Sequence, residues 1–132
     1  MKALISVTSI AAVAMGAALT FSAGSALAQD AAAGEKVFAK CKVCHQIGPE
    51  AKNSVGPVLT GVVGRPAGTY PGYNYSEANK GSGLTWDEAT LQVYLKNPKA
   101  KVPGTKMIFP GLASDDDINN VIAYLKANSP AK

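Results

Sequence analysis

The segment from Gly48 to Gly83 constrains the fold most strongly, because it holds 12 glycines and prolines in 36 residues. Loops of this length are uncommon inside a compact domain and are usually functional. Their backbone polar groups and scattered apolar side chains need a structure to pack against. The rest of the chain offers little for that purpose, so we expect a large apolar cofactor to complete the core.

Residues 1–28 have the pattern of a cleaved secretory signal peptide. Lys2 is followed by an uncharged apolar run, Ala3 to Phe21, and then by small residues that end in Ala26-Leu27-Ala28. This order is typical of export signals. A transmembrane anchor is the alternative, but the run contains polar residues and no basic stop-transfer cluster follows it. We therefore predict cleavage after Ala28 and a periplasmic location, with a retained anchor as the alternative.

The predicted mature chain, residues 29–132, has the length of a single domain. Its 104 residues carry a formal charge of +3, because 12 basic residues remain against 9 acidic ones. An exported protein seldom meets nucleic acid, so we expect no nucleic-acid partner. The mild basic excess favours a weak, salt-sensitive attraction to an acidic partner. We expect a monomer.

Three stretches have the apolar spacing of helices, and no run alternates long enough to predict a sheet. Asp30 is placed to cap a helix that starts at Ala31. The run Thr85-Trp86-Asp87-Glu88 fits a capping box, which predicts that a second helix opens there and ends at Asn97-Pro98. Ser114 precedes three aspartates and a periodic apolar run, which predicts the third helix. The predicted fold class is all-α.

The run Cys41-Lys42-Val43-Cys44-His45 matches the C-x-x-C-H pattern of c-type haem attachment. Two thiols three residues apart on a helical turn can add to the two vinyl groups on one side of a haem. The next residue then points its imidazole at the iron. The pattern predicts one covalently attached haem c, held by Cys41 and Cys44, with His45 as an axial iron ligand.

Two other sites with this pattern are excluded by the rest of the sequence. A structural zinc site takes four Cys or His ligands, whereas the whole chain has two cysteines and one histidine. A thioredoxin-type redox site would need a βαβ context, which the helix pattern does not provide.

Met107 is the candidate for the second axial position, because Met1 and Met15 lie in the predicted signal peptide. It ends a turn-rich stretch, Lys101 to Met107, that can bring a thioether to the face opposite His45. The alternative is that Met107 fills a gap in the core, which would leave the iron open or bound by a lysine. Methionine opposite histidine makes a closed site with a raised potential. A closed site carries electrons and has no easy place for a substrate.

These residues together resemble the class I c-type cytochromes, with bacterial cytochrome c₂ and mitochondrial cytochrome c as the nearest types. The resemblance extends from Gly34 to Lys126. Its most specific part is the combination of the C-x-x-C-H motif with the Pro-Gly-Thr-Lys-Met loop at this separation. Further matching stretches are Gly34 and Phe38, Gly56-Pro57, Gly64-Arg65, Tyr75, Asn79, Leu84-Thr85-Trp86, Tyr94-Leu95, Asn97-Pro98-Lys99 and Ala123-Tyr124-Leu125.

The resemblance implies the small cytochrome c fold, in which three main helices and long loops surround a covalently bound haem. It implies that the Pro57 carbonyl accepts a hydrogen bond from His45 Nδ1 and that Tyr94 hydrogen-bonds near the Met107 sulfur. It also implies that Gly34 and Phe38 meet Tyr124 where the first and last helices cross. Five residues would surround the haem propionates: Arg65, Tyr75, Asn79, Trp86 and Thr105.

The implied function is that of a soluble periplasmic one-electron carrier and not of an enzyme. The carrier would take electrons from a membrane cytochrome bc complex and pass them to a terminal oxidase or, in a phototroph, to a photosynthetic reaction centre. The alternative is a haem peroxidase or gas-binding protein with a labile sixth ligand. Such a protein would need a distal acid–base group, and no second histidine is available for that task.

A partner-docking face is predicted from the lysines of the two segments that flank the expected haem edge. The attachment helix and the Met107 loop contribute most of these lysines, and Lys52 and Lys80 come from the long loop. The three aspartates that open the third helix can lie away from this edge. The lysines predicted for the face are Lys36, Lys40, Lys42, Lys99, Lys101 and Lys106.

Overall fold

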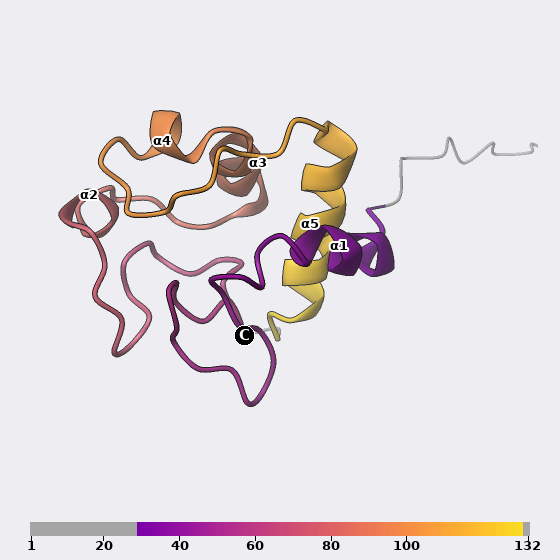
Figure 1. Cartoon of the computed structure of the whole chain (residues 1–132), viewed down its shortest axis with the longest axis horizontal. Coiled ribbons are helices and arrows are strands. Elements are labelled where there is room, and N and C mark those ends of the chain that lie inside the picture. The colour runs from indigo at the N-terminus through magenta and orange to yellow at the C-terminus, as the bar shows by residue number, and fades with distance from the viewer. Residues whose placement is uncertain (1–28, 131–132) are drawn as a thin grey trace, which may run out of the picture.

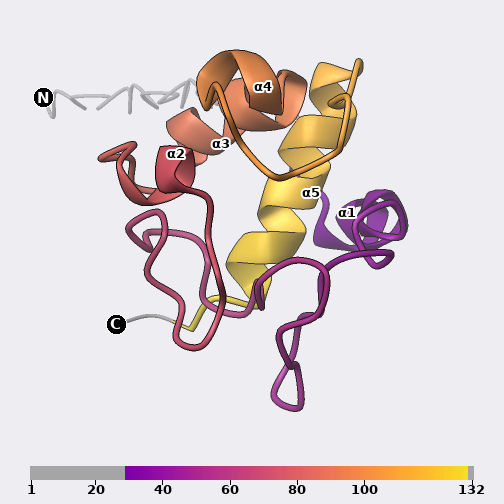
Figure 2. The ribbon, with the colours of Figure 1, turned by 60° about the vertical axis from the view of Figure 1, so that its left-hand side comes forward.

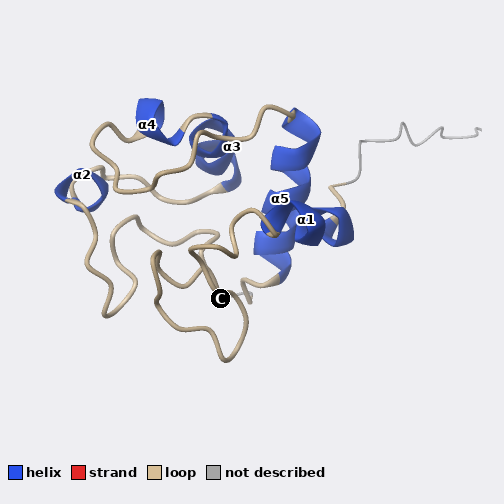
Figure 3. Cartoon of the chain, in the orientation of Figure 1, coloured by secondary structure: helices blue, strands red, loops and turns tan. Residues whose placement is uncertain are grey.

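The computed structural model describes residues 29–130, which fold into helices and loops (Figure 1, Figure 3). The predicted signal peptide, residues 1–28, lies outside the described range. Among the described residues there is no strand, only an isolated bridge between Pro66 and Thr85. The predicted all-α class is confirmed. The helices are α1 (Ala31–Phe38), α2 (Glu77–Lys80), α3 (Glu88–Lys96), α4 (Pro98–Lys101) and α5 (Asp115–Ala127).

The first and last helices begin at the predicted caps. The Asp30 carboxylate accepts hydrogen bonds from the backbone N–H groups of Ala32 and Ala33, at 2.9 and 3.2 Å. Ser114 Oγ accepts from Asp117 N at 3.2 Å, and the three aspartates lie in the first turn of α5. These contacts satisfy N–H groups that have no partner within the helix.

In the residues that the structure describes, no helix is long and apolar enough to span a bilayer.

The predicted start of the second helix is wrong. Asp87, and not Thr85, caps α3, because its carboxylate accepts from Thr90 N at 2.7 Å. The preceding residues are held extended by backbone hydrogen bonds to the long loop, including Trp86 N to Arg65 O at 2.9 Å. This tertiary pairing overrides the local capping pattern, so the helix begins only once the chain leaves Trp86.

Two short helices were not predicted from the sequence. Asn97 ends α3 and at the same time caps α4, where Pro98 occupies the first turn. Proline suits that position, because it has no N–H and its φ angle is already helical. Within the long loop, Ser76 Oγ accepts from Asn79 N at 3.1 Å and caps α2. The Gly/Pro-rich segment is therefore not entirely loop.

The core forms where α1 lies across the middle of α5 (Figure 2). A methyl group at Gly34 would lie 1.9 Å from the Asn120 carbonyl oxygen, so only glycine allows the helices to approach this closely. The rings of Phe38 and Tyr124 lie 5.1 Å apart, and Phe38 and Ile122 are fully buried. The predicted meeting of Gly34 and Phe38 with Tyr124 is confirmed.

The long loop, residues 48–83, contacts both the chain after α5 and the residues that lead into α3. Val58 and Val62 are buried. The chain after α5 also holds the loop, because Gly61 N donates to Asn128 O at 3.1 Å. On the other side, the bridge near Thr85 joins the loop to the approach to α3. The loop therefore has a fixed path on which its functional side chains can be positioned.

We predict that Gly34→Ala lowers the free energy of unfolding by more than about 2 kcal/mol, because overpacking a well-packed site typically costs about 1–3 kcal/mol and the atom it strikes here is backbone. Glu35→Ala, on the exposed side of the same helix, should change stability little. Guanidinium unfolding followed by circular dichroism measures both. Equal stability of the two variants would show that the α1–α5 contact is looser than described.

Candidate functional site

The two cysteines and the histidine lie on one turn that continues from α1. Cys41 N donates to Phe38 O at 2.8 Å, and His45 N donates to Cys41 O at 2.9 Å. Both cysteines are free and partly exposed. Burial raises the pKa of the Cys41 thiol above its usual value. A redox-active cysteine needs a lowered pKa, so this turn is unlike a thiol–disulfide catalytic site.

The His45 ring is oriented by a single hydrogen bond. Its Nδ1 lies 2.8 Å from the Pro57 carbonyl oxygen. A carbonyl can only accept, so Nδ1 carries the proton and Nε2 keeps a free lone pair. Burial lowers the pKa of His45, although the bond to Pro57 opposes this shift. The imidazole is therefore held neutral, with Nε2 available to bind a metal.

Gly56 contributes to the site in a way that the sequence analysis missed. A methyl group at Gly56 would lie 2.4 Å from His45 Cε1 and 2.6 Å from Nδ1. Its backbone N–H donates to Cys44 O at 2.8 Å, which draws the long loop against the attachment turn. Gly56 therefore provides the flat surface on which the imidazole rests. The Gly-Pro pair before a buried valine was the available indication of this role.

The Met107 side chain is also fixed by a hydrogen bond. The Tyr94 hydroxyl donates to Met107 Sδ at 3.2 Å, and Thr105 Oγ1 accepts from Met107 N at 3.2 Å. Burial raises the pKa of Tyr94, so its hydroxyl stays protonated and continues to donate at neutral pH. The structure thus brings together Tyr94, Thr105 and Met107 from the sequence-predicted set.

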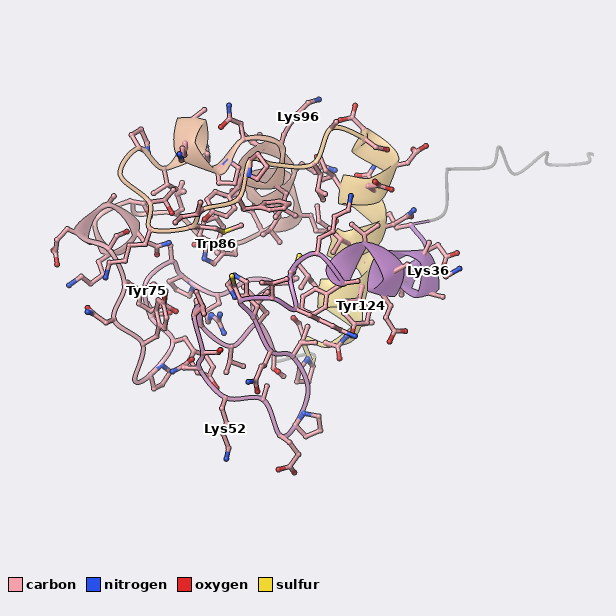
Figure 4. The ribbon with its side chains drawn as sticks, in the orientation of Figure 1. Lys36, Lys52, Tyr75, Trp86, Lys96 and Tyr124 are labelled. Carbon is pink, nitrogen blue, oxygen red and sulfur yellow. The ribbon has the colours of Figure 1, made fainter. Side chains whose placement is uncertain are left out.

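Trp86 joins this group to the long loop. Its ring lies 4.6 Å from the Tyr94 ring, centre to centre, and is almost fully buried. The backbones of Trp86 and Arg65 are hydrogen-bonded. Figure 4 shows Trp86 and Tyr75 on the side of the molecule away from Lys36.

Arg65 and Tyr75 form a second group around Tyr70, which the sequence analysis did not single out. The Arg65 guanidinium lies 4.8 Å from the centre of the Tyr70 ring and donates to the carbonyl oxygens of Val58 and Thr60, at 2.8 and 3.3 Å. The Tyr75 hydroxyl accepts from Tyr70 N at 3.1 Å. Nothing in the sequence around Tyr70 indicated that an aromatic face would support the arginine.

Asn79 lies in α2 with its side-chain oxygen buried and without a hydrogen-bond partner. Buried polar atoms are nearly always hydrogen-bonded. The same amide also carries an NH₂ group that can donate, so Asn79 is suited to a polar group that the protein chain does not itself supply.

The described residues contain no group of three or more His, Cys, Asp or Glu side chains that could hold a metal ion. The site instead offers one imidazole and one thioether. A protein-only metal centre of the zinc type does not fit this donor set, whereas the axial positions of a haem iron do.

The predicted lysines do not form one tight cluster. Lys36 lies on α1, and Lys40 and Lys42 follow it, whereas Lys99 and Lys101 belong to α4, on a different side of the molecule (Figure 1). All six are exposed except Lys101, which is partly buried. Lys106 Nζ donates to Asn74 O at 3.0 Å. The predicted lysines are therefore spread over separate parts of the surface.

An all-α fold with an attachment turn after its first helix and a methionine loop before its last defines a class I c-type cytochrome. The family model described as Cytochrome c matches residues 31–129, and the chain belongs to the cytochrome c family. Cytochrome c2 of Rhodomicrobium vannielii is 60% identical over 111 residues, which cover 84% of this chain and 89% of that protein.

Solved structures agree with this assignment. Cytochrome cH from Methylobacterium extorquens is 56% identical, with a TM-score of 0.71 over 74% of this chain and 98% of that one. Cytochrome c2 from Rhodospirillum centenum is 43% identical, with a TM-score of 0.73 over 76% of this chain and 99% of that one. The chain is a cytochrome c2-type electron carrier and not an enzyme.

We predict that Gly56→Ala displaces the His45 ring and lowers the yield of haem-containing protein several-fold, because the added methyl group would overlap the imidazole. Gly81→Ala is the control: its φ is −88°, and its added methyl group would meet only the Glu77 carbonyl, at 3.1 Å. The haem absorbance per mole of purified protein measures both. Normal haem content in the Gly56 variant would contradict the packing against His45.

Proposed function

We propose that this chain is a periplasmic carrier of one electron, with a single haem c attached to Cys41 and Cys44 and bound axially by His45 and Met107. The observation that carries the proposal is the pair of hydrogen bonds His45 Nδ1 to Pro57 O, at 2.8 Å, and Tyr94 hydroxyl to Met107 Sδ, at 3.2 Å. Each bond orients a ligand atom and leaves a lone pair free on it.

The residues fit a haem in several ways that do not depend on the family. Gly56 keeps the His45 face flat. The two cysteines lie one helical turn apart and form no disulfide. The haem iron supplies the chemistry, which is the uptake and release of one electron. The protein sets the potential and the face on which partners dock.

His45 and Met107 have complementary tasks in electron transfer. The Pro57 carbonyl accepts a hydrogen bond from Nδ1 of His45, which makes the imidazole a more basic ligand at Nε2. The thioether favours the reduced iron and raises the potential. With both His45 and Met107 bound to it, a haem iron would keep no open position for a substrate.

The propionates need donors or a cation if they are to be buried. We propose that Arg65, Tyr75, Asn79, Trp86 and Thr105 contribute these. Arg65 uses two of its donors on backbone carbonyls and has others to spare. The Tyr75 hydroxyl accepts from Tyr70 N, so its own proton is free to donate.

For the physiological role, we propose transfer from a membrane cytochrome bc complex to a terminal oxidase or a photosynthetic reaction centre. A signal peptide of residues 1–28, removed on export, would place the carrier in the periplasm. We propose that the lysines of the attachment helix and of the Met107 loop attract acidic partners and orient the carrier before contact.

Met107→Ala should open the sixth position, allow carbon monoxide to bind the reduced protein at neutral pH and lower the potential. Met107→His should lower the potential without opening the site, because imidazole favours the ferric iron. Both shifts should be a sizeable part of the roughly 0.8 V that axial ligands span. Potentiometric titration and carbon monoxide difference spectra measure them.

Ile108→Ala is the matched control, since Ile108 is the next residue and its side chain is 94% exposed. It should keep the wild-type potential and bind no carbon monoxide. Carbon monoxide binding by the unmodified protein would favour the peroxidase or gas-binding alternative.

Removal of one positive charge from the docking face should slow electron transfer from the cytochrome bc complex at low ionic strength. Lys42→Gln and Lys99→Gln suit this test, because neither lysine joins an ion pair among residues 29–130. We expect a decrease of about two- to tenfold in the second-order rate, which vanishes at high salt.

Lys126→Gln removes the same charge at the end of α5, where Lys126 pairs with Glu88. It should leave the rate nearly unchanged. Equal decreases in all three variants would mean that partners sense net charge and not a defined face.

A further inference from the structure

The segment that carries Met107 is closed at its base. It runs from Asn97, after α3, to Ser114, before α5, and appears in Figure 2 as α4 and the loop that leaves α4 and returns to the top of α5. Its two ends meet where the last residues of α3, Leu95 and Lys96, contact residues 111–115. We call this meeting point the neck of the segment.

Three contacts hold the neck. Leu112 N donates to Leu95 O at 2.8 Å. Lys96 Nζ pairs with Asp115 Oδ1 at 2.9 Å. Gly111 lies so close to α3 that a methyl group on it would be 2.1 Å from Lys96 O, and its φ of +108° is one that other residues rarely adopt.

Away from the neck, few polar contacts tie the segment to the rest of the fold. The Tyr94 hydroxyl reaches Met107 Sδ, and Lys106 Nζ reaches Asn74 O. Ile108, beside the methionine, is almost fully exposed. Val102 and Leu112 are buried in the core, so a released neck would free the stretch between them, and the entropy gained would favour the state in which Met107 has left its position.

We propose that this neck sets how often Met107 leaves its position, with Lys96, Gly111 and Asp115 acting as positioning residues. The inference rests on the proposed role of Met107 as an iron ligand. The side chains of Lys96 and Asp115 are 59% and 74% exposed and line a surface groove of about 590 Å³. Dissolved ions reach the pair there, so higher salt loosens the neck.

The fold provides a matched control at the other end of the same two helices. Glu88, which begins α3, pairs with Lys126, near the end of α5. This pair lies outside the Met107 segment. Its loss weakens the α3–α5 contact without opening the neck. Comparing variants of the two ion pairs therefore distinguishes a general loss of stability from release of the Met107 segment.

The test uses the haem-containing protein and compares Asp115→Asn, Lys96→Gln and Gly111→Ala with Lys126→Gln. The first readout is native-state hydrogen exchange at the amides of Thr105, Met107 and Leu112, with the buried residues Val121 and Ile122 reporting global unfolding. The second readout is the rate at which imidazole binds the ferric protein.

We expect both readouts to rise roughly two- to fivefold in Asp115→Asn and Lys96→Gln, as for the loss of an exposed ion pair. We expect roughly tenfold or more in Gly111→Ala, where backbone strain is added. Lys126→Gln should lower global stability and leave both readouts at the wild-type level. The charge-exchanged pair Lys96→Asp with Asp115→Lys should restore slow exchange.

Equal acceleration of amide exchange and imidazole binding in Lys126→Gln and Asp115→Asn would overturn the proposal. The release of Met107 would then follow general stability and not the contacts of the neck. Faster exchange in the neck variants without faster imidazole binding would overturn the role of Met107 as the blocking ligand. Met107→Ala serves as the reference for that outcome. If it binds imidazole no faster than the wild type, the failure lies in the proposed ligand and not in the neck.

Discussion

The close contact of α1 with α5 at Gly34 is the constraint on which the rest of the structure depends. Because no side chain separates the helices there, α1 is held in a fixed position and the turn Cys41 to His45 leaves it in a fixed direction. Gly56 and Pro57 then fit against the His45 ring. A small shift of α1 would carry both cysteines and the imidazole with it.

The same helix, α5, positions the opposite side of the site through α3. Polar contacts join the two helices at three levels, Glu88 with Lys126, Gln92 with Asn119 and Lys96 with Asp115. Tyr94 projects from α3 to the Met107 sulfur, and the neck next to it closes the Met107 segment. The helix α5 therefore supports both His45, through α1, and Met107, through α3. These two residues lie 62 positions apart in the sequence, and we propose them as ligands of one cofactor.

The helix starts that depend on contacts between near neighbours in the sequence could be predicted. Asp30 and Ser114 cap their helices as expected, because a capping side chain bonds to residues two or three positions away. The predicted helix start at Thr85 is wrong because the loop around Arg65, which is distant in the sequence, holds residues 85 and 86 extended. The support of Arg65 by Tyr70 and the neck at Gly111 also depend on long-range packing. Neither leaves a periodic pattern that a sequence could reveal. The C-x-x-C-H motif predicts His45 as a ligand, but only the fold gives the orientation of its ring.

The central claim is that the frame holds Met107 against a haem on the side opposite His45. The proton NMR spectrum of the reduced holoprotein tests it most directly, since Met107 is the only methionine after residue 28 and its methyl signal needs no further assignment. If the sulfur binds the iron, the methyl group lies over the porphyrin ring, and the ring current shifts its signal far upfield of the ordinary methionine position. A methionine methyl signal at its ordinary position would contradict the account.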